Sequence, residues 1–486
     1  MTKLCILHTN DTHSHLDDFA KRAYLVNKIR QENEKENIPT FLFDAGDALT
    51  GNLYFLMYEG LKEAKLMSLL KYDAMTLGNH EFDKGSPTLT GFIDQVDFPI
   101  ITSNIDFTKD EELGGFANRK IFPNLTFQIN EDYNLGVFAL TTLSTLDNAS
   151  PSEETIFSDP FETAKKAVTN MQKQGVELVI LLSHLGYEND IKMAEQVPGI
   201  DLIIGAHTHH LLENPVVINE TSIVQAGSFG TYLGRVDIDI VDAQPKDAKT
   251  AESPKLIKIS GEVINVHDLK DDVNEDPMFK EIICTSQEEK RKYYLRIVAE
   301  AGMELIGDRA SLQSGETNLG KLVTNAFLTK ARQLGYDADI SIINGMGIRK
   351  SLPVGPICFG DIYKVLPFGC NLRIYQLTGQ EIIDTLENGL YPQTSGLKGT
   401  LDKTKEVGKQ IQNLTLLDGT PIRPTEKYMV ASNTFVGEGR DFYVGFTPVG
   451  LVADNLEADV ELFSEYLESL PQPVVYHSEN DLLVIH

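Results

Sequence analysis

The sequence predicts an α/β protein with two domains that are joined by a helix. A chain of 486 residues exceeds the roughly 150 residues of an ordinary domain, so one small module is excluded. Short apolar strands alternate with helical patterns through the first 265 residues, as in layered α/β domains. A charged helical stretch follows, which has no runs of glycine or serine. After it, strand and helix patterns alternate again. We therefore expect a first domain at 1–275, a connecting helix at 276–304 and a second domain at 305–486.

Short apolar segments predict the strands of the first domain, which are Leu4–Leu7, Thr40–Phe43, Ala74–Leu77, Pro99–Ser103, Leu135–Thr141, Glu177–Ser183, Asp201–Ile204, Ser222–Ala226 and Gly234–Ile240. An apolar period near 3.6 predicts helices between them, among which are Phe19–Asn33, Glu59–Leu70 and Phe161–Gln174. The later strands follow one another closely, so we expect part of the sheet to be antiparallel. The polar stretch Ala243–Pro254 is expected to form a surface loop inside a hairpin.

The same patterns recur in the second domain. They predict strands at Ile340–Ile343, Leu372–Leu377 and Tyr428–Ser432, and helices at Asn318–Leu334, Gly379–Gly389 and Asn455–Leu470. After Pro471 only a terminal strand at Asp481–Ile485 is indicated.

The charge of the chain restricts its partners. Lys and Arg number 43 against 71 Asp and Glu, which gives a net charge of −28. Such a protein repels nucleic-acid polymers and anionic membranes. It can still bind a small phosphorylated substrate if metal ions locally compensate the negative electrostatic field of the protein. No apolar run approaches the roughly 20 residues that cross a bilayer, and the apolar stretch before His8 is too short for a signal peptide. We therefore expect a cytoplasmic protein, and the oligomeric state stays open.

Polar and charged side chains follow the predicted strands of the first domain. Eight of the eleven histidines lie in the first 210 residues, and most of them come just after a strand. Because the carboxyl ends of strands line the functional crevice of an open α/β sheet, these segments are expected to meet at one rim. They are Asn10-Asp11-Thr12-His13, Asp44-Ala45-Gly46-Asp47, Gly78-Asn79-His80-Glu81, His184 and Gly205-Ala206-His207-Thr208-His209.

This collection of ligands suits two divalent metal ions. Imidazoles and carboxylates without thiolates favour Mn, Zn, Fe or Co. Residues two apart in an extended segment point to the same side, so Asp11 and His13 can reach one ion or two adjacent ions. Asp47 is the natural carboxylate to bridge them. Each fragment alone also fits a turn or a helix cap, and only their shared place after strands favours the metal site.

The motifs resemble the signature of the calcineurin-like metallophosphoesterases. Their surroundings, Ile6–Asp11 and Gly78–Gly85, are similar to the branch that contains 5′-nucleotidases and UDP-sugar hydrolases. The likeness continues into Asn344–Arg349 and Leu366–Gly369, so it covers nearly the whole chain. It implies a four-layer αββα metallophosphoesterase domain, a connecting helix and a second α/β domain that closes over the substrate.

The resemblance also implies roles for individual residues. One metal ion would be held by Asp11, His13, Asp47 and His209, and the other by Asp47, Asn79, His184 and His207. The catalytic histidine would be His80, oriented by Asp83. Two cations roughly 3.5–4 Å apart lower the pKa of a shared water molecule, so the expected reaction is attack of a bridging hydroxide on the phosphate of a nucleotide. His80 would stabilise the developing charge or protonate the leaving oxygen, unless it merely caps a helix.

In the second domain the resemblance implies a nucleotide-binding site. Phe368 and Phe435 match an aromatic pair that stacks a nucleobase, and Asn344, Arg349 and Asp441 match contacts to nucleoside or phosphate. The alternative is that both rings belong to the core. Three departures leave specificity open: Gly315 stands where an arginine is expected, Met346 interrupts a triple glycine, and a glycine-rich stretch reads Gly439-Arg440-Asp441-Phe442-Tyr443.

Other functions remain possible on the sequence. Within the enzymes these are a broader phosphomonoesterase, a UDP-sugar hydrolase and a 2′,3′-cyclic-nucleotide phosphodiesterase. A metal-stabilised binding protein without activity is the alternative outside them. The segment Gly315–Lys321 nearly matches the P-loop motif, but Leu322 occupies the position of the Ser or Thr that would hold Mg²⁺.

Overall fold

The computed structural model describes residues 2–242, 255–270, 274–454, 456–477 and 481–486. The packing divides the chain into two compact units, Met1–Lys290 and Arg291–His486. Within the part of the chain that is described, none of the helices has an apolar stretch of membrane-spanning length.

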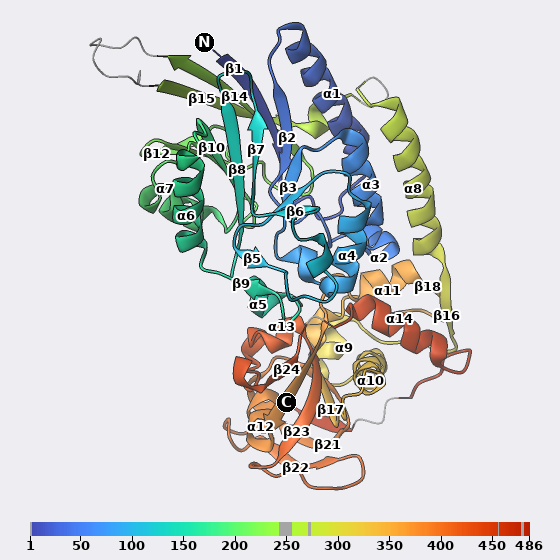
Figure 1. Cartoon of the computed structure of the whole chain (residues 1–486). Helices are drawn as coiled ribbons and strands as arrows, with labels where there is room; N and C mark the ends of the chain where they lie inside the picture. The colour runs from blue at the N-terminus through green and yellow to red at the C-terminus, as the bar shows by residue number, and fades with distance from the viewer. Residues whose placement is uncertain (1, 243–254, 271–273, 455, 478–480) are drawn as a thin grey trace. The chain divides into compact units, whose positions relative to one another are not determined.

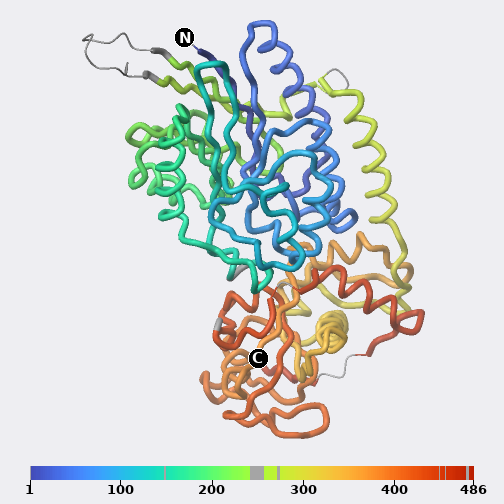
Figure 2. The backbone as a smooth tube through the Cα atoms, viewed as in Figure 1, coloured from blue at the N-terminus to red at the C-terminus, as the bar shows by residue number. Residues whose placement is uncertain are grey.

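The first sheet of the N-terminal unit has seven strands in the order β15-β14-β1-β2-β3-β4-β6. β1, β2, β3, β4 and β6 are parallel, and β14 and β15 add an antiparallel edge beside β1. Figure 2 shows this edge, where the N-terminal strand lies beside the yellow-green strands. The strands are β1 (Thr2–Thr9), β2 (Thr40–Asp44), β3 (Ala74–Thr76), β4 (Ile100–Ile101), β6 (Ile121–Phe122), β14 (Tyr232–Asp242) and β15 (Lys255–Asn265).

The second sheet has six strands in the order β12-β13-β11-β10-β8-β7. Its centre, from β8 to β13, is parallel. β10 reads Leu-Val-Ile-Leu-Leu-Ser-His and is buried throughout, which is the pattern of a parallel strand covered on both faces. The strands are β7 (Asn124–Gln128), β8 (Asn134–Thr141), β10 (Leu178–His184), β11 (Leu202–Gly205), β12 (Val216–Ile218) and β13 (Thr221–Val224), and a separate pair is β5 (Ile105–Asp106) with β9 (Ile156–Phe157).

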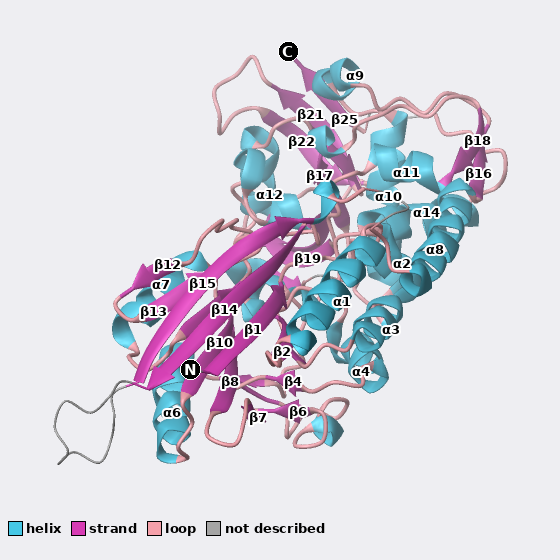
Figure 3. Cartoon of the chain, turned by 90° about the horizontal axis from the view of Figure 1, so that it is seen from above, coloured by secondary structure: helices cyan, strands magenta, loops and turns pink. Residues whose placement is uncertain are grey.

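The two sheets face each other and helices cover their outer faces, as Figures 1 and 3 show. Apolar side chains of both sheets, among them Ile6 and Ile180, form one core between them. Separate cores lie under the helices on either side. The four-layer αββα prediction is therefore confirmed. The helices are α1 (Phe19–Lys35), α2 (Leu53–Tyr58), α3 (Leu61–Leu70), α4 (Gly85–Gln95), α5 (Thr145–Asn148), α6 (Pro160–Lys173), α7 (Tyr187–Gln196) and α8 (Pro277–Leu295).

The C-terminal unit is also built from sheets and helices. Its main sheet has the order β20-β17-β23-β19-β24, a second sheet has the order β22-β21-β25, and β16 pairs with β18. The strands are β16 (Ile297–Ala301), β17 (Ile340–Asn344), β18 (Gly355–Cys358), β19 (Leu372–Thr378), β20 (Pro392–Ser395), β21 (Leu397–Asp402), β22 (Ile411–Leu416), β23 (Lys427–Asn433), β24 (Leu451–Ala453) and β25 (Leu482–Ile485).

Capping residues mark the beginning of two helices of this unit. The hydroxyl of Thr317 accepts from the backbone of Gly320 and begins α10, and Thr378 with Glu381 forms a reciprocal cap on α12. The helices are α9 (Arg309–Ser314), α10 (Asn318–Gln333), α11 (Phe359–Val365), α12 (Gly379–Asn388), α13 (Thr434–Gly437) and α14 (Asp459–Ser469).

The predicted strands and helices are present in both units, with two differences. The connecting helix, expected at 276–304, is α8 and ends at Leu295; the β-branched segment that follows forms β16 and pairs with β18. The helix expected from Asn455 begins at Asp459. The predicted hairpin loop at 243–254 lies outside the described residues, whereas the strands that flank it, β14 and β15, pair as expected.

Candidate metal centre

The predicted ligands of the N-terminal unit come together at the carboxyl ends of five parallel strands. The loop after β1 carries Asp11 and His13, and the loop after β2 carries Asp47. Asn79 follows β3, His184 ends β10, and the loop after β11 carries His207 and His209. The first three strands belong to one sheet and the last two to the other. The site therefore lies where the ends of both sheets meet.

A first group consists of Asp11, His13 and His209, whose ligand atoms all lie within 4.8 Å of one another. The Nε2 atoms of His13 and His209 face each other at 3.1 Å. Nε2 of His209 is 3.7 Å from Oδ1 of Asp11, and Nε2 of His13 is 3.9 Å from Oδ2 of Asp47.

A second group consists of Asp47, His184 and His207. Nε2 of His184 lies 3.0 Å from Oδ2 of Asp47 and 3.3 Å from Oδ1 of Asn79. The other ring nitrogen of His184 donates to the carbonyl of Ala45 at 2.8 Å, which is how proteins commonly orient a metal-ligating imidazole. Oδ2 of Asp47 thus faces His13 of the first group and His184 of the second, as a bridging carboxylate would.

The backbone is strained at the residues that make up these two groups. Five of the seven predicted ligands have positive φ angles although none is glycine: Asp11, His13, Asp47, His207 and His209. Such conformations persist only where the surroundings enforce them, and they concentrate at functional sites. The loops after β1 and β2 are fastened together here, because His13 donates its backbone N–H to the carbonyl of Asp47 at 3.0 Å.

Glu81 holds the loop that carries Asp47. Its buried carboxylate accepts hydrogen bonds from the backbone N–H groups of Asp47, Ala48, Leu49 and Gly78, at 2.6–3.1 Å. Gly78 must be small, since a Cβ atom there would lie 2.2 Å from Oδ1 of Asp47. The loops after β2 and β3 are therefore joined through one carboxylate.

The protonation states of the site suit a cation. Burial lowers the pKa of His13 to about 3 and that of His207 to about 4, so these rings are neutral and can ligate. Burial raises the pKa of Asp11 and of Glu81 to about 7, and in both the negative charge of Asp47 adds to this effect. A cation would relieve this crowding of buried acids. His184 differs, because the carboxylate of Asp47 outweighs the effect of burial and raises its pKa to about 9, so a metal ion would have to displace a proton from this ring. The donor set and the shared Asp47 together fit a pair of divalent ions.

His80 lies beside this site with its ring partly exposed. Nδ1 of His80 is 2.6 Å from Oδ2 of Asp83, and the ring packs edge-on against that of His13 at 5.1 Å. Burial disfavours the charged ring, but the carboxylate of Asp47 and the hydrogen bond to Asp83 outweigh this and raise the pKa of His80 to about 10. His80 also begins a short 3₁₀ helix (His80–Phe82), but its side chain does not cap that helix.

In the C-terminal unit the predicted substrate residues lie on neighbouring loops. Oδ1 of Asn344, at the end of β17, accepts from Asn433 at 3.1 Å, and Asn433 caps α13, which carries Phe435. The guanidinium of Arg349 lies 5.5 Å from the ring centre of Phe368.

The two rings are not ordinary core residues. Phe368 is 61% exposed and Phe435 is half-buried. Asp441, which is also half-buried, has a positive φ, and its carbonyl accepts from the backbone of Leu390 at 3.1 Å.

Two cations of this unit are paired with carboxylates. Nε of the exposed Arg440 lies 2.7 Å from a carboxylate oxygen of Glu438. Lys321, the lysine of the P-loop-like segment, is buried, and its Nζ contacts Glu316, Asp481 and the carbonyl of Thr394 at 2.9–3.1 Å. Because the ammonium group of Lys321 is buried and already contacts these oxygen atoms, it is not available to bind a phosphate.

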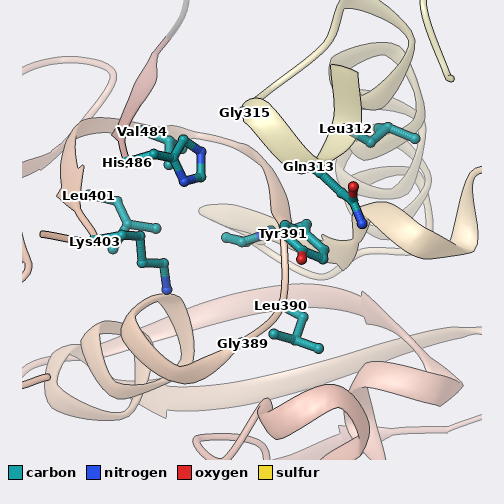
Figure 4. A pocket seen from close by; sticks show the side chains of 11 residues that line it. Leu312, Gln313, Gly315, Gly389, Leu390, Tyr391, Leu401, Lys403, Val484 and His486 are labelled. Carbon is teal, nitrogen blue, oxygen red and sulfur yellow. The ribbon is translucent and has the colours of Figure 1, made fainter. Parts of the chain in front are cut away.

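A separate cavity of about 240 Å³ lies in the C-terminal unit (Figure 4). Gln313 and Gly315 line it, so the segment in which an arginine is expected faces a mainly apolar wall instead. None of the predicted substrate residues lines this cavity. The residues around it are Leu312, Gln313, Gly315, Gly389, Leu390, Tyr391, Pro392, Leu401, Lys403, Val484 and His486.

Sequence reasoning missed two residues of the candidate metal centre. Glu81 stands in one of the predicted motifs but received no role, because a carboxylate that binds backbone N–H groups leaves no pattern of its own. Phe229, whose ring centre lies 5.7 Å from that of His13 and 5.5 Å from that of His209, belongs to none of the motifs. It lies between Gly227 and Gly230, shortly after β13, and this position beyond another strand of the second sheet was the available signal.

Comparison with known proteins covers both units. The calcineurin-like phosphoesterase family matches residues 5–211, and the C-terminal domain of 5′-nucleotidases matches residues 298–447. The solved structure of a 5′-nucleotidase precursor from Thermus thermophilus is 30% identical with a TM-score of 0.60, over 99% of both chains.

Curated relatives extend the comparison. The trifunctional nucleotide phosphoesterase protein YfkN of Bacillus subtilis is 33% identical over 97% of this chain, which spans only 34% of that protein. A 5′-nucleotidase of Vibrio cholerae is 28% identical over 96% of this chain and 90% of its own length.

Proposed function

This chain belongs to the 5′-nucleotidase family of calcineurin-like phosphoesterases, and we propose that it hydrolyses the phosphate of nucleoside 5′-monophosphates at a centre of two divalent metal ions. It is a hydrolase of phosphoric esters. The observation that carries the proposal is the position of Asp47, whose carboxylate faces both groups of ligands.

The metal-binding side chains are proposed as the family resemblance implies them. Asp11, His13, Asp47 and His209 would hold one ion, and Asp47, Asn79, His184 and His207 the other. Mn, Zn, Fe and Co all suit this set of nitrogen and oxygen ligands. When bound, two such ions lower the pKa of a water molecule and neutralise the charge of a phosphoryl group.

His80 is proposed to act on the phosphate or on its leaving oxygen. The hydrogen bond from Nδ1 to the carboxylate of Asp83 favours the protonated form of the ring, which can donate a hydrogen bond to developing negative charge or protonate the leaving group. The carboxylate of Asp83 fixes which ring nitrogen faces outward, because it accepts from Nδ1 and leaves Nε2 free to act.

The C-terminal unit is proposed to bind the nucleoside. Phe368 and Phe435 have the exposure that stacking on a base requires, and Arg349 is held against Phe368 as a cation over a ring. Asn344 and Asp441 would donate and accept hydrogen bonds to the sugar or base. Gly315, which stands where an arginine was expected, carries no charge and leaves the preference among nucleotides to experiment.

A substrate panel tests the function. The full chain is freed of metal, loaded separately with Mn²⁺, Zn²⁺, Fe²⁺ or Co²⁺, and assayed for phosphate release from AMP, UDP-glucose, a 2′,3′-cyclic nucleotide and a sugar phosphate. The expected result is the highest kcat/KM for AMP with at least one of these metals.

The alternatives predict different outcomes of the same panel. Equal kcat/KM for AMP and the sugar phosphate would indicate a broad phosphomonoesterase. Preference for UDP-glucose or the cyclic nucleotide would indicate one of the other two enzymes. No turnover with any metal, together with tight metal binding, would indicate the binding protein. Location in the cytoplasm stays a prediction, which fractionation of cells tests.

A further inference from the structure

Phe229 is an exposed aromatic residue in an unfavourable backbone conformation beside the predicted metal ligands. Its φ angle is 59°, which residues with a Cβ atom rarely adopt, and the residue is 47% exposed. A large apolar ring in water and a left-handed backbone both cost free energy. Neither is needed to close the turn, because glycine would be favoured in this conformation.

The ring of Phe229 packs against three histidine rings. The centroid distances are 5.7 Å to His13, 5.5 Å to His209 and 4.5 Å to His15. The contact with His209 is edge-to-face, at an interplanar angle of 78°. His15 in turn bonds the carbonyl of His13 at 2.9 Å. One phenyl ring thus contacts two predicted ligands of the first ion and the residue that supports one of them.

Three hydrogen bonds join the turn that contains Phe229 to the residues after β1. Its backbone N–H donates to the carbonyl of Asp11 at 2.7 Å. The side chain of Asn10 donates to the carbonyl of Gly227 at 2.7 Å and accepts from the backbone of Ala226 at 2.9 Å. The strained turn is therefore held in place by the segment that supplies Asp11 and His13.

We propose that Phe229 is a positioning residue of the metal centre, which holds the imidazoles of His13 and His209 in the orientation that binds the first ion. This inference rests on the proposed function. His209 needs such support more than the other ligands, because its ring is 37% exposed and lies on a loop. In the second group, the fully buried His184 has its ring against that of His207 instead.

Titration with Co²⁺ alone tests the proposal. The full chain is freed of metal, and binding is followed by equilibrium dialysis and by the visible absorption of Co²⁺. Phe229→Ala keeps the Cβ atom, and with it the strained φ, but loses the ring. We expect it to weaken one of two binding constants by about 10–100-fold, as losses of supporting residues do, and to leave the other within about threefold. Phe229→Tyr should restore both.

Phe442→Ala is the matched control, since Phe442 also has a positive φ, is 64% exposed, and lies in the other unit. It should leave both constants unchanged. If Phe229→Ala destabilises the apoprotein in thermal unfolding, Phe229→Leu, which keeps the apolar bulk, replaces it in the titration and should still weaken one site.

Three results would overturn the inference. If both Co²⁺ binding constants of Phe229→Ala equal those of the wild type, the ring does not support the ligands. Equal weakening of both ions would indicate a general disturbance. If Phe229→Ala has a higher KM for the phosphate-ester substrate but binds Co²⁺ as the wild type does, Phe229 contacts the substrate. A wild-type chain that binds no Co²⁺ would instead refute the proposed metal centre, and the inference with it.

Discussion

The backbone N–H of His80 donates to Oδ1 of Asp47 at 2.9 Å, so the predicted catalytic histidine is tied directly to the predicted bridging ligand. The other carboxylate oxygen of Asp47 faces His184 and His13. A single side chain thereby sets the distance between the groups that would bind metal and the group that would transfer a proton.

Replacement of Asp47 should affect both metal ions. Asp47→Asn removes the negative charge that both ligand groups share, and we expect each ion to bind at least about 100-fold more weakly, beyond the losses seen for supporting residues. Metal analysis after dialysis should then give well under two ions per chain. Asp11→Asn is the comparison, since it should weaken only one ion. Two retained ions in Asp47→Asn would disprove the bridging role.

Replacement of His80 should slow the reaction without removing metal. His80→Ala is expected to lower kcat by about 10²–10⁴-fold, the range for a lost acid or base, with the metal content of the wild type. The exposed His210 of a neighbouring loop offers a control, and His210→Ala should change kcat by less than about threefold. If His80→Ala purifies with fewer ions, His80 is a ligand rather than a proton donor.

Removal of the Phe435 ring should discriminate between substrates. Phe435→Ala is expected to raise KM for AMP by about 10-fold, because stacking on a base contributes about 1–3 kcal/mol, and to raise KM for p-nitrophenyl phosphate much less. Steady-state kinetics with both substrates measure this ratio. An equal rise in KM for both substrates would indicate that Phe435 packs against its neighbours and does not stack on the base.

The stability of the C-terminal unit should depend on the ionisation of Asp459, which begins α14. Burial raises the pKa of this carboxyl from 3.8 to about 8. Between these values the folded state holds a proton that the unfolded state has released. The contribution of Asp459 to stability is therefore fully present below about pH 4 and is lost as the pH rises towards 8, by at most about 1.4 kcal/mol per pH unit.

Asp459→Asn cannot ionise and should lack this dependence. Relative to the wild type, its urea midpoint should rise steadily from pH 5 to pH 8. The exposed Asp337 provides the control, because Asp337→Asn should run parallel to the wild type. A constant difference between Asp459→Asn and the wild type across this range would show that Asp459 is ionised in the folded chain.

Much of the fold could be predicted because its signals are local. The strand Leu178–His184 is a short, continuous apolar run, and the helix Pro160–Lys173 has an apolar period near 3.6, so both can be recognised in the sequence. The strands β16 and β18 could not be foreseen, because Ile297–Ala301 is too short to distinguish from the end of a helix until its pairing partner is known. Pairing between distant segments has no local period.

The sequence by itself determined which chemistry the site can perform. Residue types and spacing at the strand ends, such as Asp11 with His13 and His207 with His209, already indicate imidazole and carboxylate ligands for divalent ions. The tertiary structure alone decided how Asp47 is presented to both groups, how Glu81 binds four backbone N–H groups, and that Phe229 covers the rings of His13 and His209. The reason is that ligand chemistry belongs to a side chain, whereas its orientation and support come from segments that meet only when two sheets pack face to face.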